Sequence, residues 1–291
     1  MKSSLLDALA DRAPLLADGA TGTMLQAAGL PVGEAPERWV LERPDAIRQL
    51  AAQYVAAGSD LIYTCTFGAS RIGLRRCGLE EHLERINRTA VRLAREAAAD
   101  KGVWVVSSIG PTGEMLEPYG EFSAEEARAS FAEQASILAE ADVDALVCET
   151  FTDLQEALLA VCAVKEKTDK PIFASMAFES NGRTMMGVTP EDAVAQLAEA
   201  GATVIGANCG VGPDSLETVI RAMKTARPSA RLLAKPNAGL PQVVDGRAVY
   251  RLGPAALAAF AAKMKALGVA VVGGCCGTTP EHVRAMRDVL R

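Results

Sequence analysis

The chain has 291 residues, of which 30 are basic and 36 are acidic, so its formal net charge is −6 at pH 7. This balance excludes a general nucleic-acid-binding protein, which would carry a basic surface. Hydrophobic residues make up 49% of the chain, too many for a disordered protein. No apolar run reaches the length of a membrane span, so we expect neither a nucleic acid nor a membrane as a partner.

The seven cysteines are an odd number, and their spacing fits no disulfide framework. The first residues lack the apolar stretch of a signal peptide. Both observations indicate a reducing, cytoplasmic compartment.

Short apolar runs alternate with longer, alanine-rich amphipathic runs along the whole chain. The apolar runs are nearly continuous, which is typical of parallel strands buried on both faces. Eight such units predict an α/β fold, a (β/α)8 TIM barrel that forms a single domain over residues 1–291. A doubly wound open sheet is the competing fold, but no Gly-x-Gly-x-x-Gly fingerprint follows the first run. The predicted strands are Leu15–Ala20, Asp60–Phe67, Val103–Gly110, Ala145–Thr150, Pro171–Phe178, Val204–Cys209, Arg231–Ala238 and Val269–Cys276.

Helix boundaries are marked between these runs. Ser123 and Thr189 precede acidic residues at the spacing of helix N-caps. Gly58, Gly201 and Gly268 each stand just before a predicted strand, where a helix ends. We expect the first dozen residues to form a short helix at the bottom of the barrel.

Three cysteines follow two of the predicted strands at the end where barrel active sites lie. Cys209 ends the sixth strand, and Cys275 and Cys276 end the eighth. Adjacent side chains of a strand face opposite ways, so both can reach one ion only if the chain turns there, as Gly273, Gly274 and Gly277 permit. Three thiolates with a fourth position open describe a zinc site. A vicinal disulfide and two buried, unliganded cysteines are the alternatives.

Several motifs together resemble the homocysteine S-methyltransferase family, and within it most closely the homocysteine-binding module of cobalamin-dependent methionine synthase. The resemblance covers nearly the whole chain and implies a TIM barrel with zinc held by Cys209, Cys275 and Cys276. The motifs that carry it are Asp18-Gly19-Ala20-Thr21-Gly22-Thr23, Gly110-Pro111-Thr112-Gly113, Glu149-Thr150-Phe151, Asn208-Cys209, Pro236-Asn237-Ala238-Gly239-Leu240-Pro241 and Gly273-Gly274-Cys275-Cys276-Gly277-Thr278-Thr279-Pro280-Glu281-His282.

The resemblance also implies the substrate contacts. Asp18 and Glu149 would bind the ammonium group of homocysteine, and backbone N–H groups around Gly19–Gly22 would bind its carboxylate. Asn237 would stand in as a zinc ligand when substrate is absent. Each residue has a structural alternative: a turn former at Asp18, an ion-pair partner at Glu149 and a loop cap at Asn237.

Other polar residues are expected to be structural. Cys65 stands where the family more often has Asn, and we expect it to be a buried thiol without a ligand. Cys148 precedes Glu149 and should therefore point out of the ring. His82 and His282 are expected to lie at helix starts.

The implied reaction moves a methyl group to the thiol of homocysteine and forms methionine. The resemblance to methionine synthase implies a methylcorrinoid as the donor, and because the sequence holds no cobalamin-binding Asp-x-His-x-x-Gly segment, we expect it on a separate protein. The alternative donors are S-methylmethionine, S-adenosylmethionine and betaine. Two other hypotheses stay open: a non-catalytic zinc- or thiol-binding subunit of a split methionine synthase, and an unrelated barrel with a redox-active cysteine pair.

Overall fold

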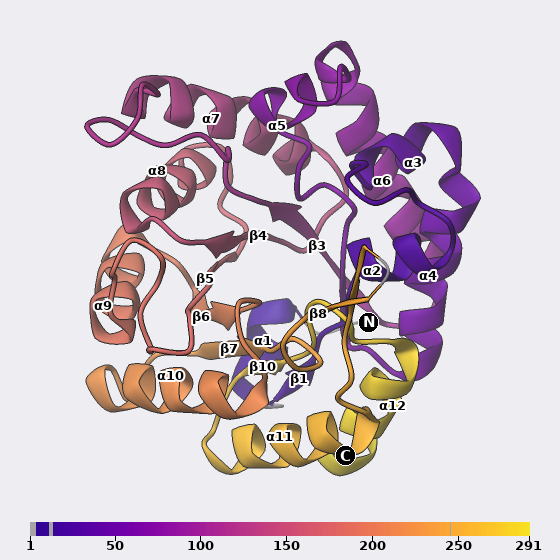
Figure 1. Ribbon diagram of the computed structural model, residues 1–291, viewed down its shortest axis with the longest axis vertical. Helices are drawn as coiled ribbons and strands as arrows, with labels where there is room; N and C mark the ends of the chain where they lie inside the picture. Colours follow the sequence, from indigo (N-terminus) through magenta and orange to yellow (C-terminus); the bar gives the residue numbers. More distant parts are fainter. Residues whose placement is uncertain (1–3, 12–13, 245) are drawn as a thin grey trace.

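Eight parallel strands form one sheet in the computed structural model, which describes residues 4–11, 14–244 and 246–291 (Figure 1). The strands follow the order β1-β10-β7-β6-β5-β4-β3-β2, and a bridge between Ala17 and Leu61 joins the two ends into a ring. The predicted TIM barrel is therefore confirmed. The strands are β1 Leu15–Leu16, β2 Leu61–Tyr63, β3 Trp104–Ile109, β4 Ala145–Phe151, β5 Ile172–Met176, β6 Val204–Asn208, β7 Leu232–Lys235 and β10 Val271–Val272.

Helices surround the ring and connect its strands (Figure 1). The capping box at Ser123 and the N-cap at Thr189 are present, and Gly58 and Gly201 end their helices in the left-handed conformation. The main helices are α4 Pro44–Ala57, α6 Leu83–Ala98, α7 Ala124–Glu140, α8 Leu154–Lys165, α9 Pro190–Ala200, α10 Pro213–Ala226, α11 Pro254–Ala266 and α12 Pro280–Leu290; shorter ones are α1 Leu5–Asp11, α2 Gly22–Ala27, α3 Glu37–Glu42, α5 Arg71–Arg75 and the 3-10 turn Glu80–His82. Among the described residues, no helix combines the length and apolar character needed to cross a membrane.

The buried apolar side chains form two layers. One lies between the sheet and the surrounding helices, and it contains Cys148, which points out of the ring as predicted. The other fills the lower half of the barrel with side chains such as Trp104 and Phe173. Leu5 and Leu9 of α1 belong to this inner layer, so the expected N-terminal helix caps the barrel bottom over Leu5–Asp11, while residues 1–3 and 12 of that expectation lie outside the described residues.

The loop after β7 contains a hairpin that the sequence analysis did not predict. Strands β8 (Gln242–Val244) and β9 (Arg247–Val249) pair antiparallel, and their side chains are mostly exposed. Exposed strands lack the apolar runs by which the barrel strands were recognised. The Asp-Gly sequence between them was the available signal, because it favours two-residue hairpin turns.

Gly206 in β6 lies where two barrel strands approach each other closely. A Cβ atom at this position would lie 1.9 Å from the backbone oxygen of Leu233 in β7. We expect Gly206→Ala to lower the free energy of unfolding by about 2–3 kcal/mol, since the backbone itself must move. The control is Gly22→Ala, where the nearest atom is 4.0 Å away, and we expect a change below about 1 kcal/mol. Equal denaturant midpoints for the two variants would contradict this account.

Candidate functional site

A layer of polar side chains lies above the apolar filling of the barrel. Alternate residues of each strand face the interior, and the inner apolar layer contains Val106, Val147, Phe173 and Leu233. Two residues later in each strand the inward position becomes polar. These positions are Ser108, Glu149, Ser175 and Lys235, all buried, and the same parity places the buried Asn208 beside them.

The three predicted zinc ligands converge at the carboxyl ends of β6 and β10. The sulfur atoms of Cys209, Cys275 and Cys276 all lie within 4.8 Å of one another, and those of Cys209 and Cys276 are 3.8 Å apart. Cys209 adopts a positive φ of 60°, which is uncommon outside glycine and turns the chain directly after β6. The cluster is partly exposed and forms part of the wall of a cavity.

Hydrogen bonds to neighbouring strand ends hold the turn that carries Cys275 and Cys276. The N–H of Cys275 donates to the backbone oxygen of Pro236 at 2.8 Å, and Cys276 accepts from the N–H of Ala238 at 2.9 Å. The N–H of Gly274 donates to the backbone oxygen of Asp18 at 3.0 Å. The turn is therefore tied to the segments after β7 and β1, which lie on either side of it.

Gly274 and Thr278 pack closely inside this turn. The Thr278 hydroxyl donates to the backbone oxygen of Cys275 at 2.6 Å and accepts from the N–H of Ala20 at 3.1 Å. A Cβ atom on Gly274 would lie 2.4 Å from that hydroxyl oxygen. The position therefore requires glycine, and the hydroxyl links the cysteine turn to the loop after β1.

Asn208 supports the cysteines from below. Its Oδ1 accepts from the N–H of Thr150 at 3.0 Å and from the Ser175 hydroxyl at 2.7 Å. Its Nδ2 donates to the Thr150 hydroxyl at 2.7 Å and lies 3.7 Å from the sulfur of Cys275. All four hydrogen-bonding positions of the amide are used, so its orientation is fixed.

Burial and mutual contact raise the pKa values of the three clustered thiols. Hydrogen bonding to Cys275 lowers the pKa of Cys209, but hydrogen bonding to Cys276 and burial raise it, to about 11 in sum. Hydrogen bonding to Cys209 lowers the pKa of Cys276, while hydrogen bonding to Cys275 and burial raise it to about 12. The pKa of Cys275 is raised as well. A divalent cation removes this penalty, because it binds thiolates and stabilises their charge.

The donor set of this cluster fits zinc. Three cysteine sulfurs are soft ligands that select zinc over magnesium or calcium. Three protein ligands are also the number found in zinc sites that keep a fourth position for substrate. The described residues therefore form a three-cysteine metal site consistent with zinc.

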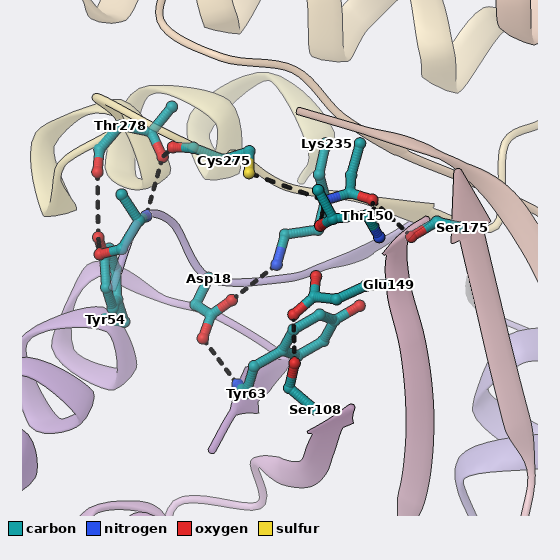
Figure 2. Close-up of polar contacts among 12 residues, drawn as sticks. Asp18, Tyr54, Tyr63, Ser108, Glu149, Thr150, Ser175, Lys235, Cys275 and Thr278 are labelled. Carbon is teal, nitrogen blue, oxygen red and sulfur yellow. Dashed lines mark hydrogen bonds and ion pairs between the residues drawn. The ribbon is translucent and has the colours of Figure 1, made fainter. Parts of the chain in front are cut away.

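Asp18, predicted to bind substrate, is already paired with a lysine in this structure. Its Oδ1 lies 3.1 Å from Nζ of Lys235, and its Oδ2 accepts the N–H of Tyr63 at 2.7 Å (Figure 2). Burial raises the pKa of Asp18, and the Lys235 ammonium partly offsets this. Burial lowers the pKa of Lys235, but Asp18 and other nearby groups raise it above its usual value. Lys235 is therefore held as a buried cation.

The carboxylate of Glu149 lies beside this pair. Its Oε1 accepts from the Ser108 hydroxyl at 2.5 Å. Burial raises the pKa of Glu149, whereas Lys235 and the Ser108 hydrogen bond lower it. Asp18, Glu149 and Lys235 thus form one buried charge cluster at the cavity.

The sequence analysis missed Lys235 because it considered only the end of the predicted strand Arg231–Ala238, from Pro236 onward. The signal was the two-residue period: Lys235 follows the inward-facing Leu233 and must point the same way. Asn237, in contrast, is buried and is not among the cavity-lining residues. Among the described residues its Oδ1 has no hydrogen-bond partner. Its role toward a metal stays a prediction.

The cavity opens at the carboxyl ends of the strands and measures about 420 Å³. Its wall joins the cysteine cluster to the charge cluster, so a small molecule can reach both. Cys65 also lines it as a buried thiol whose pKa burial raises well above the usual value. Glu37, which the sequence analysis did not select, accepts the N–H of Gly68 at 2.6 Å at the cavity edge. Gly19 borders the cavity together with the rest of the loop after β1.

Comparisons with known proteins identify relatives over nearly the whole chain. The chain is 31% identical to methionine synthase of Mycobacterium leprae over 97% of its length, although it spans only about a quarter (24%) of that protein. It is also 31% identical to the S-methylmethionine–homocysteine S-methyltransferase BHMT2 of Pongo abelii, over 99% of this chain and 82% of that one.

Solved structures give the same result. The homocysteine methyltransferase MmuM from Escherichia coli, in its oxidised form, superposes with a TM-score of 0.81 at 26% identity over 98% of both chains. Its metallated form has the same fold, with a TM-score of 0.82 at 24% identity. The model of the family described as homocysteine S-methyltransferase matches residues 15–290. The chain therefore belongs to the homocysteine S-methyltransferase family.

Proposed function

We propose that this protein is a zinc-dependent methyltransferase that moves a methyl group to the thiol of homocysteine and forms methionine. The observation that carries the proposal is the cavity that joins three convergent cysteine sulfurs to a cluster of buried carboxylates. The sulfurs suit a metal that binds a thiol. The carboxylates suit the ammonium group of an amino acid.

Cys209, Cys275 and Cys276 would hold the zinc ion. When bound, zinc supplies a Lewis acid that lowers the pKa of a coordinated thiol and makes its sulfur a nucleophile at neutral pH. In the reaction the substrate thiol gives its proton to solvent, and its sulfur lone pair forms the bond to the methyl carbon. The electron pair of the broken bond stays with the donor, so the step is balanced without an added oxidant or reductant.

The chain's own contribution is to bind and orient the acceptor. Glu149 and Asp18 supply negative charge for the ammonium group, and the loop from Gly19 to Gly22 borders the cavity where the carboxylate would lie. Fixing the two ends of a small substrate aligns its sulfur with the methyl group, and such alignment contributes several kcal/mol to catalysis.

For the donor, we propose a methylcorrinoid carried by a separate protein, so that cobalamin reaches the site through a partner. Large apolar side chains lie exposed on the segments that follow β2, β3, β5 and β7, at the end of the barrel where the cavity opens. Exposed apolar residues on several loops at this end of the barrel suit contact with another protein. They are Phe67, Met115, Tyr119, Met185, Leu240 and Val243.

A second donor is S-methylmethionine, used without a partner protein. The match to a relative named for this donor extends over 82% of that relative. A sulfonium carries its own leaving group, so no corrinoid is needed.

Metal analysis tests the cysteine site. We expect the purified chain to bind about one zinc ion, and Cys209→Ala, Cys275→Ala and Cys276→Ala each to lose it, since two thiolates do not replace a three-thiolate site. The control is Cys162→Ala, which changes an exposed cysteine on α8. Full zinc content in the three variants, measured by mass spectrometry of the metal, would refute the site.

Glu149 tests acceptor recognition. Removing a hydrogen bond to a charged group costs about 1.5–3 kcal/mol, so we expect Glu149→Gln to lower kcat/KM for homocysteine roughly 10- to 100-fold. The control is Glu114→Gln, which changes a half-exposed acid after β3 and should stay within about twofold. An unchanged KM for homocysteine in Glu149→Gln would contradict the proposed substrate contact and favour a purely structural role for Glu149.

A donor panel with homocysteine as acceptor tests the reaction itself. We expect methionine to form with methylcobalamin or a corrinoid protein, and not with S-methylmethionine, S-adenosylmethionine or betaine alone. Methionine formed from S-methylmethionine alone would assign the second donor. If zinc and homocysteine bind but no donor yields methionine, the chain is a non-catalytic subunit.

A further inference from the structure

Lys235 places an ammonium group inside the pocket that the proposed function assigns to a substrate ammonium. Its Nζ lies 3.1 Å from Oδ1 of Asp18 and 3.6 Å from the centre of the Tyr63 ring. A carboxylate and an aromatic face both attract ammonium ions. The side chain is only 4% exposed, yet it borders the cavity.

The two carboxylates of the pocket are not equally free to bind substrate. Both oxygens of Asp18 have donors from the protein, the N–H of Tyr63 and Nζ of Lys235. Glu149 has one such donor, the Ser108 hydroxyl on Oε1. Among the described residues, no hydrogen bond reaches Oε2 of Glu149, and Glu149 borders the cavity. The open acceptor therefore belongs to Glu149.

We propose that Lys235 is a specificity-determining residue for the thiol acceptor. It serves as the permanent counter-ion of Asp18 and leaves Glu149 as the group that binds the acceptor's ammonium. The proposal rests on the proposed function, which makes an amino-acid thiol the acceptor. It corrects that function in one respect, since Asp18 then acts on the substrate only through Lys235.

The charges explain how Lys235 would set selectivity. Asp18, Glu149 and Lys235 sum to −1, which one ammonium group neutralises. Without Lys235 the same pocket would hold two carboxyl groups and no cation, and unpaired charges are costly in a buried site. An acceptor with an ammonium group would then relieve more of this cost than one without it. Lys235 thus limits the preference for an ammonium group instead of creating it.

The test compares the binding of two thiols to the zinc-loaded chain by calorimetry. One is homocysteine, and the other is 4-sulfanylbutanoate, which has the same chain and carboxylate but no amino group. The measured quantity is the ratio of their dissociation constants. We expect Lys235→Met to raise the preference for homocysteine at least threefold, and Lys167→Met, which changes an exposed lysine, to leave it unchanged. A smaller rise, or a fall, overturns the proposal.

A double variant separates the roles of the two carboxylates. The double variant Asp18→Asn/Lys235→Met removes both charges of the ion pair. The pocket then keeps its net charge of −1, which Glu149 carries. We expect its preference for homocysteine to lie within threefold of the unmodified chain. A larger departure would show that Asp18 itself binds the ammonium and would overturn the proposal.

Two further measurements keep the test decisive. Circular dichroism establishes that each variant folds, and if Lys235→Met alone does not fold, the double variant decides, because it removes both members of the buried ion pair together. Binding of neither thiol by the unmodified, zinc-loaded chain would overturn both the proposed function and this inference. Binding of homocysteine with preferences that do not follow Lys235 would overturn the inference alone.

Discussion

The arrangement of the site depends on the parity of side chains in a closed ring of parallel strands. Each strand turns every second side chain into the barrel, and all eight strands end at the same mouth. Apolar side chains fill the lower positions, and α1 closes the bottom. The next inward position is therefore the floor of a cavity, and a polar residue there is buried and held in place. Glu149 and Lys235 occupy such positions on strands that are not neighbours, so their charges meet across the barrel.

The cysteines follow a different constraint, because they lie beyond the last paired residues of their strands. β6 and β10 are separated in the ring only by β7, which brings their ends within reach of one ion. The chain must then turn: Cys209 takes a left-handed conformation, and Gly274 allows the Thr278 hydroxyl to approach closely. These turns are tied to the ends of β1 and β7 by backbone hydrogen bonds, so the fold itself holds the three sulfurs close together.

These two constraints also explain what the sequence predicts and what it does not. The eight strands could be located because strands buried on both faces are continuous apolar runs. Their ends could not, because residues such as Gly274 hydrogen-bond to turns instead of continuing the ladder. The three cysteines could be grouped because strand order places their ends together. Lys235 was missed although its parity was readable, and its pairing with Asp18, 217 positions earlier in the chain, requires the closed ring. The β8–β9 hairpin has exposed strands and so gives no apolar signal.

The two halves of the cavity favour one orientation of an amino-acid thiol. A zinc ion with three thiolates would carry −1, since a charge of +2 combines with three of −1, and its open position would take the substrate sulfur as a thiolate. The carboxylate cluster also carries −1 with Lys235 charged, and only a cation lowers that charge. The sulfur end of homocysteine is therefore expected at the cysteines and its ammonium at Glu149. Lys235 limits the negative charge in the half of the cavity that holds the carboxylates. It therefore limits how strongly substrate binding depends on the ammonium group.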